Sequence, residues 1–66
     1  MSSVGEDFPT QQARVRALLE QYRVIGPNGA FGALMIRQVL ARAEEAMASG
    51  DVVRIVHAYQ ELTECK

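Results

Sequence analysis

The chain has 66 residues, a formal net charge of −1 and a single cysteine, Cys65. At this length it forms one domain at most, residues 1–66, with a thin core, because such short chains bury only about 60% of the surface that they expose when unfolded. One cysteine excludes a disulfide within the chain. Because we find neither a signal peptide nor an apolar run approaching the roughly 18 residues of a membrane span, we expect a soluble cytoplasmic protein without membrane contact.

Charge is distributed unevenly along the chain. Residues 1–10 carry a net charge of −2, residues 11–43 carry +4 and residues 44–66 carry −3. A chain with a basic and an acidic region can pair with a second copy of itself or with a charged partner. Because a core of this size needs a further source of stability and disulfides are excluded, we expect a homodimer.

The first predicted helix runs from Thr10 to about Val24 and follows a flexible N-terminal tail, residues 1–8, which shows no hydrophobic periodicity. Pro9 suits a first helical turn because its missing N–H has no partner there, and Asp7 or Thr10 provides a cap. The apolar positions repeat with the spacing of one helical face. They are Val15, Leu18, Leu19 and Tyr22.

A break is predicted at Gly26–Gly29 (GPNG), because proline lacks a donor and Asn-Gly tolerates positive φ. The second predicted helix, about Ala30–Ala48, is the longest element. Its apolar face consists of two adjacent rows, so we expect it to pack on two sides, either within a three-helix core or against a partner. The face comprises Phe31, Leu34, Met35, Ile36, Val39, Leu40, Ala43 and Met47.

A short turn precedes the third predicted helix, Val52 to about Glu64. Gly50 suits the left-handed position that ends one helix, and Asp51 suits the cap of the next. The β-branched run Val52–Val56 resembles a strand, but its apolar residues do not alternate with polar ones. So short a connection predicts an antiparallel hairpin of the second and third helices. The predicted fold is all-α, with two to three helices and the first helix packed across this hairpin.

Two groupings resemble functional motifs. Gly26–Gly32 (GPNGAFG) is glycine-rich, but no strand precedes it and no Lys-Ser/Thr pair follows, so we interpret it as an interhelical loop whose small residues allow close helix approach. His57, Glu61 and Cys65 lie along one helical face, as metal ligands can. Because Cys65 lies at the helix end and a His beside a Glu is common on exposed faces, we predict no metal, no cofactor, no catalytic residue and no small-molecule substrate.

The stretch Gly29–Leu62, GAFGALMIRQVLARAEEAMASGDVVRIVHAYQEL, resembles small helical accessory proteins of bacteriophages and prophages, and it covers about half of the chain. Some of these proteins are minimal helical dimers that bind and inhibit a host regulator or host machine. Others are virion assembly or packaging components. The resemblance implies a non-enzymatic binding function, with inhibition of a host protein preferred and a virion component as an alternative. It implies no site residues.

The candidate interface lies mainly on the second helix, whose surplus apolar face would form a dimer seam or receive a host protein. The other alternative is a DNA-binding regulator of the helix-turn-helix kind. We prefer a protein partner because the third helix, which would have to read the bases, carries Glu61 and Glu64. The candidate interface residues are Phe31, Met35, Ile36, Leu40, Met47 and Tyr59, and the candidate phosphate contacts are Arg14, Arg16 and Arg23.

Overall fold

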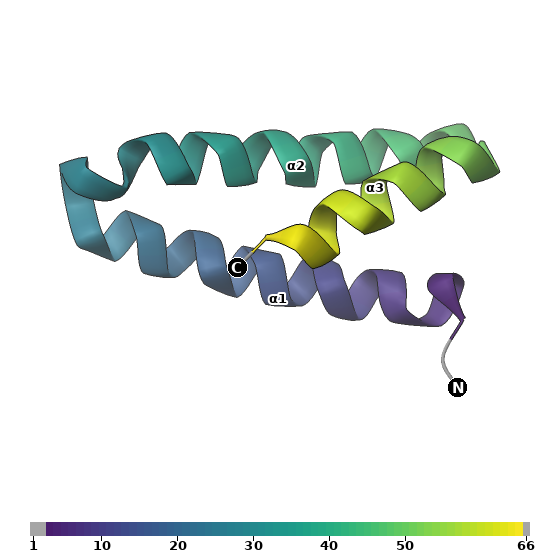
Figure 1. The fold of residues 1–66 in the computed structure, drawn as a ribbon, viewed down its shortest axis with the longest axis horizontal. Coiled ribbons are helices and arrows are strands. Elements are labelled where there is room, and N and C mark those ends of the chain that lie inside the picture. The colour runs from purple at the N-terminus through teal and green to yellow at the C-terminus, as the bar shows by residue number, and fades with distance from the viewer. Residues whose placement is uncertain (1–2, 66) are drawn as a thin grey trace.

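The computed structural model describes residues 3–65, and within that range the chain is helical almost throughout (Figure 1). The elements are α1 (Val4–Ile25), a 3-10 turn η1 (Gly26–Gly29), α2 (Ala30–Ser49) and α3 (Val52–Glu64). The all-α prediction is confirmed. No helix of the described residues has both the length and the apolar character of a membrane span.

The N-terminal boundary of α1 differs from the sequence prediction. The helix begins at Val4 rather than Thr10, so the tail predicted over residues 1–8 is wrong for residues 4–8, while Met1 and Ser2 lie outside the described residues. Ser3 caps the helix by accepting a hydrogen bond from the Glu6 N–H at 3.2 Å.

Pro9 therefore lies inside α1, where it removes one backbone hydrogen bond. The side chain of the preceding residue, Phe8, explains why the helix continues through it. Phe8 is fully buried in the core, and burial of a phenylalanine contributes roughly 1.5–3 kcal/mol. Tertiary packing of Phe8 thus outweighs the local preference of Pro9 for a helix start.

The connection between α2 and α3 is as the sequence predicts. Gly50 adopts a left-handed conformation with φ of 69°, which closes α2. The Asp51 side chain accepts hydrogen bonds from the N–H groups of Val53 at 2.9 Å and Arg54 at 3.4 Å. Two of the unpaired donors at the start of α3 are therefore satisfied, and α3 is a helix rather than a strand.

The packing order of the helices differs from the prediction. In Figure 1, α1 and α2 run alongside each other in opposite directions, and the shorter α3 crosses them obliquely. The helix that packs across is thus α3 and not α1, although α3 does turn back onto α2 and contacts both of its neighbours. η1 connects the adjacent ends of α1 and α2.

The core is thin and rich in small residues. Its largest fully buried side chains are Phe8, Val15 and Leu62, which α1 and α3 supply. The face of α2 contributes Ile36, with smaller residues along the rest of its length. The radius of gyration is 12.2 Å, against about 10.8 Å expected for a compact chain of this length. The full buried set is Phe8, Val15, Ala33, Ile36, Val39, Ala43, Ala46, Ala58 and Leu62.

Tyr59 links α3 to the start of α1. Its ring stacks on Phe8 with 6.4 Å between centroids, and its hydroxyl donates a hydrogen bond of 2.6 Å to Asp7 Oδ2. This hydrogen bond, followed by desolvation and the charge of Asp7, raises the pKa of Tyr59 above its ordinary value. The contact thus depends on a protonated tyrosine and stabilises the fold below the ordinary tyrosine pKa.

We predict opposite outcomes for the two phenylalanines of the chain. Phe8→Ala leaves a cavity in the core and should lower the free energy of unfolding by about 3–5 kcal/mol. Phe31→Ala removes a side chain that is 75% exposed, and it should change stability by less than about 0.5 kcal/mol. Urea unfolding followed by circular dichroism measures both values. Equal effects would contradict the burial of Phe8.

The Tyr59–Asp7 hydrogen bond predicts a specific titration. In a Tyr22→Phe background Tyr59 is the only tyrosine, and its phenolate absorbance should appear with a midpoint above about 10. Adding Asp7→Asn removes the carboxylate charge and should shift the midpoint back toward that value. Because the folded-state pKa is raised, the stability that this contact contributes should be lost as pH rises through that midpoint. An unchanged midpoint in the Asp7→Asn variant would show that the carboxylate does not act on Tyr59.

Candidate protein-binding surface

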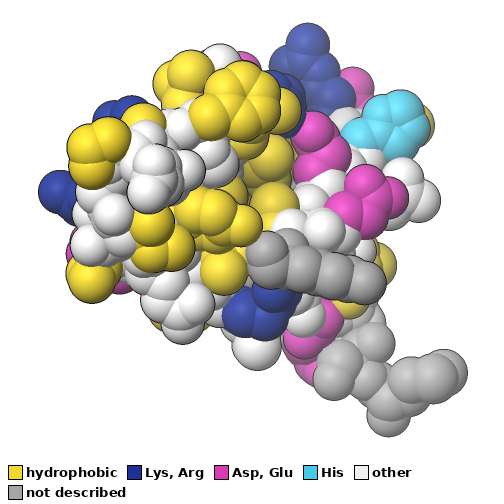
Figure 2. Space-filling view, turned by 60° about the vertical axis from the view of Figure 1, so that its left-hand side comes forward, with side chains coloured by type: hydrophobic (Ala, Val, Ile, Leu, Met, Phe, Trp, Pro, Cys, Tyr) yellow, Lys and Arg dark blue, Asp and Glu magenta, His cyan; other side chains and the backbone are white. Residues whose placement is uncertain are grey.

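Hydrophobic side chains gather at the end of the molecule where α1 turns into α2 (Figure 2). Val24 is 84% exposed and Phe31 is 75% exposed, which leaves most of two large apolar side chains in contact with solvent. Grouped apolar residues of this kind mark protein-binding surfaces, whereas single exposed ones carry no such meaning. We call this group the turn patch; it consists of Val24, Ile25, Phe31, Leu34 and Met35.

Two glycines fix the backbone beneath the turn patch. A Cβ atom at Gly29 would overlap the carbonyl oxygen of Tyr22, and a Cβ at Gly32 would lie 2.6 Å from the Tyr22 ring. A Cβ at Gly29 would thus meet backbone, and a Cβ at Gly32 would require the Tyr22 ring to move, which fits the interpretation of GPNGAFG as a loop whose small residues allow close helix approach. Gly26 adds a positive φ of 84° where α1 ends. The patch side chains are thus carried by a tightly packed turn.

α3 does not extend over the turn between α1 and α2 (Figure 1). The 13 residues of α3 extend about 20 Å, whereas the 20 residues of α2 extend about 30 Å. A shallow groove of about 250 Å³ marks the place where α3 ends on α2, lined by Met35 and Val39 on one side and by Glu64 and Cys65 on the other. Beyond this groove, the layer of α1 and α2 has no third helix over it within the described residues.

The structure distributes the six candidate interface residues over several places. Phe31 and Met35 lie in the turn patch, whereas Met47 lies at the opposite end, beside the turn into α3. Ile36 is 6% exposed and belongs to the core, and Leu40 and Tyr59 are half-buried against it. These residues do not form one continuous seam, because much of the wide apolar face of α2 is used for contacts with α1 and α3.

Three residues of the turn patch were missed by sequence reasoning. Val24 and Ile25 are the last two residues of α1, directly before Gly26. Val24 lies outside the predicted apolar face of this helix, and Ile25 lies just beyond its end. Leu34 was counted in the wide apolar face of the second helix but not among the candidate interface residues, and it is 46% exposed. The available signal was the accumulation of five large apolar residues on both sides of a Gly-Pro break, where a loop is ordinarily polar.

A smaller apolar group surrounds the other turn of the chain. Met47 on α2 is 45% exposed, and Val52 and Val53 in the first turn of α3 are 72% and 63% exposed. These three residues lack an aromatic side chain and lie beside the acidic cap residue Asp51. We call them the far-end group; it serves below as a matched control for the turn patch.

The candidate phosphate contacts are all engaged within the chain. Arg14 donates to the backbone carbonyls of Leu62 at 2.6 Å and of Cys65 at 2.7 Å, so it caps the C-terminal end of α3. Arg16 lies 3.8 Å from Glu44, and Arg23 lies 3.1 Å from Glu20. Arg14 in particular has a structural role that sequence reasoning did not anticipate, because its partners are about fifty residues away in the chain.

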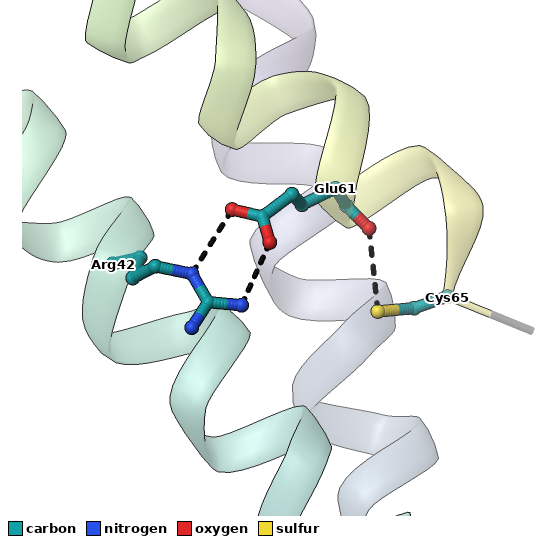
Figure 3. Close-up of polar contacts among 3 residues, drawn as sticks. All are labelled: Arg42, Glu61 and Cys65. Carbon is teal, nitrogen blue, oxygen red and sulfur yellow. Dashed lines mark hydrogen bonds and ion pairs between the residues drawn. The ribbon is translucent and has the colours of Figure 1, made fainter.

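In the row of His57, Glu61 and Cys65 on α3, the last two residues make contacts within the chain (Figure 3), whereas His57 is exposed. Arg42 of α2 donates two hydrogen bonds to the Glu61 carboxylate, at 2.7 and 3.1 Å, while the Cys65 thiol donates to the Glu61 backbone oxygen at 3.4 Å. Burial raises the pKa of the Cys65 thiol, which favours the protonated form over a metal-binding thiolate. Among residues 3–65, no three His, Cys, Asp or Glu side chains are placed to hold a metal ion.

Comparison with known proteins gives no relative for this chain: no family model matches it, and no curated protein and no solved structure does so either.

We predict that Arg14→Ala destabilises the fold by about 1–2 kcal/mol, because two charge-assisted hydrogen bonds to the end of α3 are lost. Arg23→Ala, which removes only an exposed contact within α1, should cost less than about 0.5 kcal/mol. Chemical denaturation gives both values, and hydrogen exchange should show faster opening of the last turn of α3 in Arg14→Ala alone. If the two variants behave alike, Arg14 is not a cap.

Proposed function

We propose that this chain is a non-enzymatic protein-binding module whose turn patch contacts a host protein. The observation that carries the proposal is the exposure of five large apolar side chains on a turn whose backbone is fixed by Gly29 and Gly32. A rigid apolar surface loses little conformational entropy when a partner covers it, so its burial contributes to affinity. The resemblance to phage accessory proteins is the reason for choosing a host protein as the partner and inhibition as the result.

Phe31 is the expected anchor of this contact. It is the only aromatic residue of the patch, it is 75% exposed, and no core contact depends on it. Aromatic anchors of this kind supply a large share of the binding energy at protein interfaces. Met35 lies one helical turn further along α2, so the two side chains share one face of the helix and can enter the same apolar groove of a partner.

The non-enzymatic part of the proposal rests on how the perturbed side chains are used. Arg42, Tyr59 and Cys65 have raised pKa values, and each of them is engaged in a contact within the chain. Arg42 and Tyr59 join α3 to its neighbours, and the Cys65 thiol donates to a backbone carbonyl of α3 itself. A catalytic acid, base or nucleophile is ordinarily free to reach a substrate. The nucleic-acid alternative is less favoured because Arg14, Arg16 and Arg23 each have a partner within the chain.

The test compares two double alanine variants, one in each exposed apolar group. Immobilised wild-type protein is exposed to a lysate of the cells in which the chain naturally occurs, and any bound protein is identified, purified and titrated by calorimetry. Phe31→Ala/Met35→Ala should weaken the measured affinity by about thirtyfold or more, which corresponds to an interface anchor worth about 2 kcal/mol. Val52→Ala/Val53→Ala in the far-end group should leave it unchanged.

Two results would refute the proposal. The first is a partner that binds both double variants with the affinity of the wild type, which would place the contact away from the turn patch. The second is retention of DNA at moderate salt that is lost in an Arg16→Ala/Arg23→Ala variant, which would favour the nucleic-acid alternative.

A further inference from the structure

The layer formed by α1 and α2 has a second exposed surface, which is separate from the turn patch. A shallow groove of about 500 Å³ runs between α1 and α2, and no residue of α3 lines it. Its apolar part is made of Leu19, Leu40 and Ala41, of which the two leucines are half-buried and the alanine is exposed. Leu40 thus points part of its side chain into the core and leaves the rest available in this groove.

Four charged residues flank the apolar part in an alternating pattern. At one end, Arg16 of α1 lies 3.8 Å from Glu44 of α2. Toward the turn, the signs are exchanged, with Glu20 on α1 and Arg37 on α2. Glu20 lies about 6 Å along α1 from Arg16, and Arg37 lies about 10 Å along α2 from Glu44, so the four charges surround Leu19, Leu40 and Ala41. Arg23 contacts Glu20 from the turn side at 3.1 Å.

This pattern is complementary to itself. Two copies can meet face to face in two symmetric ways. If the two-fold axis is parallel to the helices, each α1 lies over the partner's α2, so that Arg16 meets Glu44 and Glu20 meets Arg37. If the axis is perpendicular to the helices and lies in the plane between the two copies, each α1 lies over the partner's α1, so that Arg16 meets Glu20 and Arg37 meets Glu44. Both arrangements bring opposite charges together at every corner, which is the requirement for an isologous interface.

The dimensions of the chain also favour a second copy as the occupant. The accessible surface is 4608 Å², whereas a folded chain of 7.3 kDa exposes about 4,200 Å². The chain thus exposes somewhat more surface than is usual for a folded protein of its mass. If the α1–α2 layer of a second copy packed on the side away from α3, the two layers would form a four-helix arrangement in which each pair of helices covers the other.

We propose that this chain forms a two-fold symmetric dimer through the groove lined by Leu19, Leu40 and Ala41, with the alternating charges of Arg16, Glu20, Arg37 and Glu44 setting the register. This surface differs from the turn patch, so the dimer leaves the turn patch available for another protein. The proposal does not depend on the function proposed above.

The experiment uses two variants in which the four charged residues around the groove, called the rim, all carry the same sign. Arg16→Glu/Arg37→Glu makes the rim wholly acidic, and Glu20→Arg/Glu44→Arg makes it wholly basic. Light scattering after size exclusion should give twice 7.3 kDa for the wild type and 7.3 kDa for each variant alone. An equimolar mixture of the two variants should return to the dimer mass, with a dissociation constant at least tenfold below that of either variant alone.

The mixture also controls for folding, because misfolded variants would not recover the dimer. Circular dichroism should show unchanged helix content, and Phe31→Ala/Met35→Ala should remain a dimer. A wild type that stays monomeric at millimolar concentration would overturn the proposal. So would dimers of both charge variants as tight as that of the wild type, or loss of the dimer in Phe31→Ala/Met35→Ala, which would place the seam at the turn patch.

Discussion

The length of α3 is the constraint from which the surface of this molecule follows. Its 13 residues cover only part of the layer that α1 and α2 form. The largest buried side chains, Phe8, Val15 and Leu62, come from the part that α3 covers. At the other end, where the chain makes its glycine-rich turn, the apolar residues have no partner helix and remain exposed. One short helix thus determines both where the core lies and where the turn patch lies.

Because α3 contributes few large side chains to the core, polar contacts do much to hold it in place. Arg14 caps its C-terminal end, Arg42 forms a forked ion pair with Glu61, and Tyr59 donates to Asp7. Each contact joins α3 to one of the two longer helices. Arg14 and Arg42 are directed toward backbone and carboxylate groups of the same chain, so the arginine content of the middle segment reflects internal packing in part, rather than a surface for anions.

Local signals in the sequence were sufficient to predict the helices and their connections. Gly50 and Asp51 adopt the conformations that their residue types favour, and the GPNG break lies where Pro27 and the flanking glycines require it. The start of α1 was placed too late, because Pro9 is a good helix starter by local rules. The cap by Ser3, a local signal of S-x-x-E spacing, and the burial of Phe8 against α3 show why the helix begins earlier.

The candidate surfaces were harder to predict than the helices, because exposure depends on tertiary packing, which local sequence signals do not show. A helical pattern shows that α2 has a wide apolar face, but not which part of that face the other helices cover. Ile36 and Phe31 are both large and apolar, yet the first is buried and the second is exposed, because their separation of five residues places their side chains about 140° apart around α2. The partners of Arg14 lie about fifty residues away and become apparent only in the folded chain.

The close contact of Tyr22 with Gly29 and Gly32 has a consequence for how this protein can evolve. A side chain at Gly29 would meet the backbone carbonyl of Tyr22, so selection for folding should hold this glycine constant, whereas a side chain at Gly32 would require the Tyr22 ring to move. Val24 and Phe31, which the same turn carries, are largely exposed, so replacing them should leave the fold intact. A lineage can therefore exchange the exposed side chains of the turn patch while the scaffold stays the same. Rapid adaptation to a changing target requires this separation of invariant support from variable contact residues.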